Sequence, residues 1–286
     1  MFTPKIIALD LDGTLFSGTG EVTPFTREQI RIAADKGITI VISTGRPFTG
    51  LPFEVAQELD IKYAITANGA GIYRIADKTC LKEDAIAPQD AAELCRLLNQ
   101  KHLHLDAFIH GDAYTQSSSF HIIRHSRILP ESVKNYILTT RNQVTDLAAF
   151  LTEHNLPLQK ATLTFEQEAD GVLIDREETK ELLSRHPEVS VVCGGYQNLE
   201  FTKAGVTKGT GLRFLCDYLK IPIEASMACG DSENDLDILN AAGYSVAMEN
   251  ADESIRAICD DVTASNNQDG VGKAIAKLIQ TQERRS

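Results

Sequence analysis

Ile6-Ile7-Ala8-Leu9-Asp10-Leu11-Asp12-Gly13-Thr14-Leu15 is an apolar run that ends in two acids. The short run Ile6–Leu9 is typical of a strand that is buried on both faces of a parallel sheet. Asp10 and Asp12 therefore stand where a core strand ends and the chain turns. Two partly desolvated carboxylates repel each other unless a cation lies between them. The pattern favours a metal with hard oxygen ligands, Mg²⁺, over the alternative of a solvated Asx turn with Gly13 at positive φ.

The sequence on either side of this run alternates between strand and helix patterns. The N-terminal part predicts strands at Ile6–Leu9, Ile38–Ile42 and Tyr63–Thr66, with helices at Thr26–Lys36 and Phe53–Leu59 between them. The same alternation returns near the C-terminus, in the helix Thr207–Lys220, the strand Ser226–Cys229, the helix Leu236–Ala242, the strand Ser245–Met248, and helices at Ala251–Cys259 and Gly270–Gln280. Strands that alternate with helices predict an α/β fold with a Rossmann-like parallel sheet.

The middle of the chain has a different pattern. His110-Gly111-Asp112 lies between two strand-like segments, as in a hairpin with glycine at its turn. Further helix and strand patterns follow up to Val189–Cys193 and Leu199–Thr202. We therefore expect residues 1–84 and 196–286 to form one discontinuous domain, and residues 85–195 to form an inserted α+β domain.

The composition excludes some classes of partner. The chain has 286 residues, a 43% hydrophobic and 24% charged composition, and a formal net charge of −12. Nucleic-acid binding requires many phosphate-neutralising Lys and Arg side chains, so we expect no nucleic-acid partner. No apolar stretch approaches the length of a membrane span, so we expect no membrane partner. The six cysteines have no C-x-x-C spacing, and no secretory leader is apparent, which predicts reduced thiols and a cytoplasmic location.

Polar residues follow each strand of the predicted sheet. Ser43-Thr44-Gly45-Arg46 follows one strand, and Gly230-Asp231-Ser232-Glu233-Asn234-Asp235 follows another. Ligands of open α/β sheets bind at the carboxyl ends of the strands, so these segments should converge with Asp10 and Asp12. Simpler interpretations remain open at this point: a helix cap for Ser43 or Thr44, and acids favoured by a helix dipole for the second segment.

Lys208 is unusual for its position. It stands at the start of a predicted helix, where the helix macrodipole disfavours a cation by roughly 0.3–1 kcal/mol. An anionic phosphate, together with the acids at neighbouring strand ends, would compensate for this penalty. The alternative is an exposed lysine that tolerates it.

These motifs together resemble the haloacid dehalogenase superfamily, and in particular its Cof-type phosphatases, which carry a large α+β cap of the C2B type. The resemblance covers the whole chain, because four motifs occur in the expected order. They are Asp10-x-Asp12-Gly13-Thr14-Leu15, Ser43-Thr44-Gly45-Arg46-Pro47, Lys208, and Gly230-Asp231-x-x-Asn234-Asp235. Asn68-Gly69-Ala70 and Asp269-Gly270-Val271 also fit the family pattern, whereas Ser232 replaces a frequent glycine.

The resemblance implies a role for each motif residue. Asp10 would be the nucleophile that forms an aspartyl-phosphate, and Asp12 would be the general acid and base. Mg²⁺ would be held by Asp10, Asp12 through its main-chain carbonyl, Asp231 and Asp235. The phosphate group would be bound by Leu11, Thr44, Gly45, Lys208 and Asn234. Arg46 and Asn68 would contact the substrate or the cap. Phe16–Gly20 would be a mobile flap, and the cap would select the leaving group.

The expected function is therefore Mg²⁺-dependent hydrolysis of small phosphorylated metabolites, such as sugar phosphates or phosphorylated cofactors. Two alternatives remain: a phosphosugar mutase of the same superfamily, and a non-catalytic module that binds phosphometabolites. The sequence predicts neither the physiological substrate nor the oligomeric state.

Overall fold

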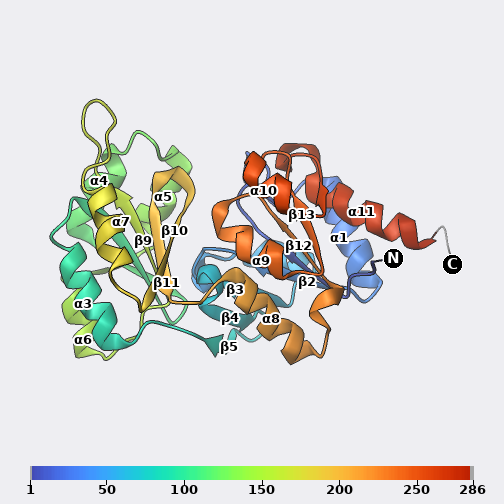
Figure 1. Ribbon diagram of the computed structural model, residues 1–286, viewed down its shortest axis with the longest axis horizontal. Coiled ribbons are helices and arrows are strands. Elements are labelled where there is room, and N and C mark those ends of the chain that lie inside the picture. Colours follow the sequence, from blue (N-terminus) through green and yellow to red (C-terminus); the bar gives the residue numbers. More distant parts are fainter. Residues whose placement is uncertain (1, 284–286) are drawn as a thin grey trace. The chain divides into compact units, whose positions relative to one another are not determined.

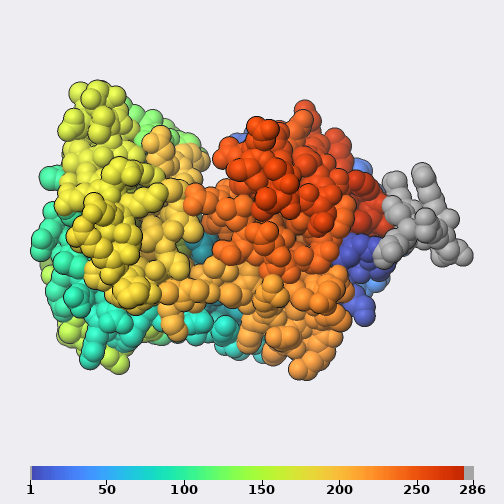
Figure 2. All heavy atoms as spheres, in the orientation of Figure 1, coloured from blue at the N-terminus to red at the C-terminus, as the bar shows by residue number. Residues whose placement is uncertain are grey.

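The structure is a computed structural model that describes residues 2–283, and it divides into two compact units. Of the described residues, the first unit comprises 2–46, 51–82 and 207–283, and the second comprises 47–50 and 83–206. The two ends of the chain, coloured blue and orange to red, thus pack into one unit (Figures 1 and 2). No helix among residues 2–283 is both long enough and apolar enough to cross a membrane.

The first unit is built on an eight-stranded sheet with the order β14-β13-β12-β1-β2-β3-β4-β5. The strands are β1 (Ile6–Leu9), β2 (Thr39–Ser43), β3 (Tyr63–Thr66), β4 (Gly71–Arg74), β5 (Thr79–Glu83), β12 (Ser226–Gly230), β13 (Tyr244–Ala247) and β14 (Asp261–Val262). Neighbouring strands from β14 to β3 are parallel, and β4 pairs antiparallel with β3. The predicted parallel α/β core is therefore confirmed.

The helices α1 (Pro24–Asp35), α8 (Lys208–Leu219), α9 (Leu236–Ala241) and α10 (Glu253–Ile258) contact strands of this sheet (Figure 1). The first unit also contains α2 (Phe53–Glu58) and α11 (Gly270–Glu283), and α11 packs against α1. Ile6 and Ala8 of β1 belong to the core cluster that includes α8 and α9. Ile7 and Leu9 are equally buried and, because side chains alternate along a strand, point to the opposite face. Strand β1 is thus covered on both sides, as its uninterrupted apolar sequence predicts.

The second unit contains a separate six-stranded sheet with the order β10-β11-β9-β6-β7-β8. Its strands are β6 (Leu103–Ile109), β7 (Asp112–Gln116), β8 (Asn142–Val144), β9 (Lys160–Phe165), β10 (Val189–Cys193) and β11 (Leu199–Lys203). Its helices are α3 (Pro88–Leu98), α4 (Phe120–His125), α5 (Glu131–Thr140), α6 (Leu147–Glu153) and α7 (Arg176–Ser184). The hairpin predicted around His110-Gly111 joins β6 to β7, and both turn residues have positive φ.

The second unit extends further along the chain than the sequence predicts. The predicted boundary between residues 195 and 196 falls inside this unit, which ends at residue 206. The physical reason is strand pairing, because β11 lies between β10 and β9 in the same sheet. Residues 47–50 also belong to this unit, and within them the Thr49 amide donates to the carbonyl of Gly111 at 3.0 Å. The predicted start at residue 85 lies two residues after the observed one at 83.

Candidate active site

Asp10 is a buried carboxylate at the carboxyl end of β1. Only 5% of its surface is exposed, and its backbone N–H continues the sheet by donating to the Cys229 carbonyl at 3.2 Å. Burial raises the pKa of Asp10 well above its usual value, Lys208 lowers it, and Asp235 and Asp231 raise it further. The side chain therefore lies where a negative charge needs cationic partners.

Lys208 is one such partner, and the interpretation of Lys208 as an exposed residue is wrong. It is the first residue of α8, which Thr207 caps by accepting from the Thr210 amide at 3.2 Å. The Lys208 side chain is fully buried, and its Nζ lies 2.7 Å from Oδ1 of Asp10 and 2.7 Å from Oδ1 of Asp235. Burial alone would lower the pKa of Lys208, but these two carboxylates raise it above its ordinary value. The pair of acids offsets the unfavourable helix dipole.

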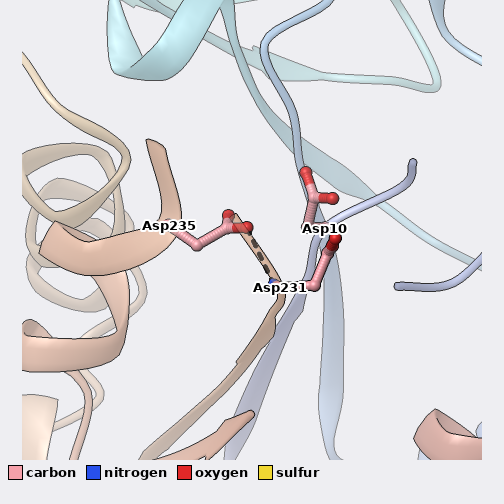
Figure 3. A group of neighbouring side chains, drawn as sticks. All are labelled: Asp10, Asp231 and Asp235. Atoms are coloured by element: carbon pink, nitrogen blue, oxygen red, sulfur yellow. Dashed lines mark hydrogen bonds between the residues drawn. The ribbon is translucent and has the colours of Figure 1, made fainter. Parts of the chain in front are cut away.

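Two acids that follow β12 complete a carboxylate cluster with Asp10 (Figure 3). One oxygen each from Asp10, Asp231 and Asp235 lies within 4.8 Å of the others. Burial raises the pKa of Asp231 to about 6, while the hydrogen bond from the Thr14 hydroxyl, 2.7 Å long, lowers it. Three hard oxygen donors at this spacing, in surroundings that disfavour their charges, fit a divalent cation such as Mg²⁺.

The third acid of this cluster is already engaged by protein donors. Oδ2 of Asp235 accepts hydrogen bonds from the Asp231 and Ser232 amides at 3.1 and 3.2 Å, and its Oδ1 binds Lys208. Asp235 thus shapes the loop that carries Asp231 and anchors the lysine. Asp10 and Asp231 are the better placed of the three to offer an oxygen directly to a cation.

Gly13 makes room for Asp231. Its φ is +85°, and a Cβ atom built at this position would lie 2.3 Å from Oδ2 of Asp231. Both the backbone conformation and the contact therefore require glycine between Asp12 and Thr14. The sequence motif alone does not indicate a role for Thr14, but its place directly after Gly13 brings its hydroxyl to Asp231.

Asp12 is not a member of the carboxylate cluster, and 63% of its side chain is exposed. Both of its oxygens bind the guanidinium of Arg46, with Nε 2.9 Å from Oδ2 and Nη2 2.6 Å from Oδ1. Asp10 and Asp12 thus occupy different environments although they are two residues apart. Leu11 between them has a fully buried side chain, so a phosphate contact at Leu11 would have to come from its backbone.

Thr44 and Gly45 follow β2, at the same sheet edge as Asp10. The Thr44 amide donates to the Ile65 carbonyl at 2.8 Å, so this N–H serves the backbone network. The Thr44 hydroxyl accepts from the Arg46 amide at 3.2 Å. This contact closes a short turn, and the first helical segment after it is a 3₁₀ turn at Phe48–Gly50. The helix-cap interpretation of Thr44 is therefore wrong.

Asn68 connects three parts of the site. Its φ is +54°, and its backbone N–H donates to the Thr44 carbonyl at 3.2 Å. Its side-chain Oδ1 accepts a hydrogen bond from Nδ2 of Asn234 at 3.4 Å. Next to it, a Cβ atom on Gly69 would lie 2.0 Å from the Thr207 carbonyl oxygen. This turn packs against the residue that precedes Lys208, so it braces the segments that carry Thr44, Asn234 and Lys208.

Two asparagines that the sequence does not single out hold the first and the middle residue of the predicted flap. Nδ2 of Asn266 donates to the Phe16 carbonyl at 2.8 Å, and the Gly18 amide donates to Oδ1 of Asn267 at 2.7 Å. Nδ2 of Asn250 donates to the Gly13 carbonyl at 2.9 Å. The nearest signal in the sequence is the motif Asp269-Gly270-Val271, which begins two residues after Asn267.

Comparison with known proteins finds haloacid dehalogenase-like hydrolases and phosphatases as relatives of this chain. A family model described as haloacid dehalogenase-like hydrolase matches residues 7–275. The 5-amino-6-(5-phospho-D-ribitylamino)uracil phosphatase YcsE of Bacillus subtilis is 30% identical over 278 residues, which cover 96% of each chain. Pyridoxal phosphate phosphatase YbhA of Escherichia coli is 30% identical over 282 residues, covering 96% of this chain and 98% of the relative. The structure of a haloacid dehalogenase-like hydrolase from B. subtilis matches with a TM-score of 0.81 at 26% identity, covering 95% and 99% of the two chains.

Proposed function

The chain belongs to the haloacid dehalogenase-like hydrolase family and is a phosphatase, and we propose the following reaction for it. It hydrolyses small phosphorylated metabolites in a Mg²⁺-dependent reaction, with an aspartyl-phosphate on Asp10 as the intermediate. One observation carries this proposal: Asp10 is buried 2.7 Å from Lys208 and beside two further acids, while Asp12 is exposed and separate.

In the first step, an oxygen of Asp10 attacks phosphorus in line with the ester bond. The new bond joins that oxygen to phosphorus, and the bond between phosphorus and the leaving oxygen breaks. Asp12 gives its proton to the leaving oxygen, so an alcohol departs. The exposure of Asp12 supports this role, because a proton carrier has to reach both substrate and water.

In the second step, Asp12 takes a proton from water. The resulting hydroxide attacks phosphorus, the bond between phosphorus and Asp10 breaks, and inorganic phosphate leaves. Asp10 is then a carboxylate again and Asp12 is protonated, so the cycle is complete.

Asp10, Asp231 and the Asp12 carbonyl would hold Mg²⁺, with Asp235 directly behind them. When bound, the ion supplies positive charge that lets a carboxylate approach a phosphate dianion. Lys208 supplies a second positive charge from the protein itself, and its Nζ lies 3.3 Å from Oδ1 of Asn234.

The phosphoryl oxygens would be bound by Lys208, Asn234, the Thr44 hydroxyl, and the Gly45 and Leu11 amides. These donors stabilise the charge that spreads over the phosphoryl oxygens in the transition state. The brace formed by Asn68 supports this assignment, because it connects the Thr44 and Asn234 segments.

The substrate class follows from two considerations. The curated relatives act on a phosphorylated ribitylaminouracil and on pyridoxal phosphate, both small phosphate monoesters. The net charge of −12 disfavours nucleic acid as a partner. We assign the choice of leaving group to the inserted unit and place the protein in the cytoplasm.

Phosphate release tests the proposal. The full-length chain is incubated with p-nitrophenyl phosphate and a panel of phosphorylated metabolites, including pyridoxal phosphate, in Mg²⁺ or in EDTA. We expect release in Mg²⁺, none in EDTA, and none from Asp10→Asn, which preserves the size of the side chain. Interconversion of sugar phosphate isomers without release would instead indicate a mutase. Binding without any turnover would indicate a non-catalytic module.

A further inference from the structure

Among residues 2–283, the side chain of Arg46 holds the carboxyl group of Asp12. The two contacts, 2.9 and 2.6 Å long, engage both carboxylate oxygens with two nitrogens of one planar group. Such a bidentate pair fixes the rotation of the carboxylate as well as its position. An exposed aspartate without such a partner would sample several rotamers.

Arg46 is itself fixed by neighbouring segments. Its amide donates to the Thr44 hydroxyl at 3.2 Å, and its carbonyl accepts from the Ala67 amide at 2.9 Å. Its guanidinium carbon lies 5.6 Å from the centre of the Phe16 ring. Phe16 is tied back to the Asp12 loop, because its amide donates to the Leu11 carbonyl at 2.9 Å. The guanidinium is thus held between the segment after β2 and the segment after β1.

We propose that Arg46 is a positioning residue, which orients the carboxyl group of Asp12 for proton transfer. This inference rests on the proposed function, in which Asp12 is the acid and base. The sequence-based expectation that Arg46 contacts the substrate or the cap stays a separate prediction.

The geometry allows Arg46 to orient Asp12 without blocking it. Each carboxylate oxygen has about two lone-pair positions, and the guanidinium occupies one on each oxygen. One position on each oxygen therefore remains to carry the proton that passes to the leaving oxygen, or that comes from water. A lysine at position 46 would keep the positive charge, but it could not reproduce the planar two-point contact.

A double-mutant cycle tests the proposal. Wild type, Arg46→Ala, Asp12→Asn and the double variant are compared in Mg²⁺ by the rate of alcohol release in the first turnover. An alkyl phosphate such as glycerol phosphate is used, because its leaving oxygen needs a proton. General acid catalysis contributes roughly 10²–10⁴-fold, so we expect Arg46→Ala to slow this step by about 10–100-fold. With p-nitrophenyl phosphate, whose leaving group needs little protonation, the loss should be much smaller.

If Arg46 acts through Asp12, the Arg46→Ala change should have no effect in the Asp12→Asn background, within about threefold. If Arg46 binds substrate instead, the double variant should be slower than Asp12→Asn by the same factor by which Arg46→Ala is slower than wild type. This loss of rate should appear with both substrates. That result would overturn the proposal. Arg46→Lys provides a second test. If Arg46 positions Asp12, the first-turnover rate of Arg46→Lys should be close to that of Arg46→Ala. If Arg46 acts only through its charge, the rate should return toward that of wild type.

Two controls separate this inference from the proposed function. Thermal unfolding establishes that each variant is folded, and added guanidinium ion should partly restore Arg46→Ala but not Asp12→Asn. If wild type releases no alcohol from either substrate, the proposed function itself fails. If wild type turns over and the cycle is additive, only the role of Arg46 is wrong.

Discussion

Nζ of Lys208 lies 2.7 Å from Oδ1 of Asp10, and at most 7% of either side chain is exposed. A buried ion pair of this kind is favourable only when both partners are present, because removing one leaves an uncompensated charge. The proposed nucleophile therefore depends on a lysine 198 positions away in the chain for its charged form.

Lys208→Met should abolish phosphate release and destabilise the fold. The change leaves Asp10 and Asp235 buried without their lysine, which we expect to cost about 3–5 kcal/mol of unfolding free energy. Urea denaturation in EDTA measures the loss. Asp235→Asn added to Lys208→Met should recover part of it, because one uncompensated charge disappears. A double variant with the sum of both single losses would contradict this interpretation.

The stability of the metal-free protein should depend on the ionisation of Asp231. The pKa of Asp231 is raised from 3.8 to about 6 in the folded state, so the folded state binds this proton more tightly than the unfolded chain does. The resulting stabilisation is present at low pH and is lost as the pH rises through about 6. In EDTA, wild type should therefore lose stability relative to Asp231→Asn between about pH 4 and pH 7.

Mg²⁺ should reverse this loss, because a bound cation compensates the ionised carboxylate. The increase in melting temperature caused by Mg²⁺ should be larger at about pH 7 than at about pH 5, where the proton competes with the metal. Asp231→Asn should show little increase at either pH. An increase that is independent of pH in wild type would show that Asp231 does not bind the cation.

Gly69→Ala should be more damaging than an ordinary glycine substitution. Gly69 has φ +104°, and the added Cβ would lie 2.0 Å from the Thr207 carbonyl oxygen, so the start of α8 would have to shift. Gly37 is the matched control, with φ +81° and no atom within 4 Å of the added Cβ. We expect a loss of about 1–2 kcal/mol for Gly37→Ala, from backbone strain alone, and a larger loss for Gly69→Ala. Equal losses in urea denaturation would contradict the packing argument.

Asp12→Asn should slow the enzyme in a way that depends on the leaving group. Without the acid, the first turnover of an alkyl phosphate should fall by roughly 10²-fold or more, while p-nitrophenol release should persist. The second step should be slow with both substrates, because the base is also lost. First-turnover and steady-state rates separate these effects. Equal first-turnover losses for both leaving groups would exclude Asp12 as the acid.

The sequence predicted the parts of the fold that are governed by burial. The apolar runs of β1 and β2 are uninterrupted, so both faces of these strands have to be covered by other elements. This pattern indicates a parallel sheet with helices on both faces, and it places Asp10 at the carboxyl edge of that sheet. Strand pairing was less predictable. Leu199–Thr202 has a clear strand pattern, but its sequence does not reveal that β11 pairs with β9 and β10. The predicted end of the inserted domain therefore comes before the observed one.

Within the site, residue types and order were predictable, but contacts between side chains were not. Lys208 was identified from its unfavourable place at a helix start, and the structure shows which carboxylates compensate it. The pairing of Arg46 with Asp12 joins segments 34 positions apart, and no periodic pattern encodes such a contact. The asparagines that hold Phe16 and Gly18 are polar loop residues, which are indistinguishable from ordinary surface residues in a single sequence.

Trapping the covalent intermediate tests whether Asp10 is the nucleophile. The Asp12→Asn variant is mixed with p-nitrophenyl phosphate and Mg²⁺, quenched in acid during the first turnover, digested, and analysed by mass spectrometry. We expect one phosphoryl group on Asp10, at a level that matches the p-nitrophenol released, and none in Asp10→Asn. Release of p-nitrophenol with no phosphoryl group on the protein, or with the group on another residue, would contradict it.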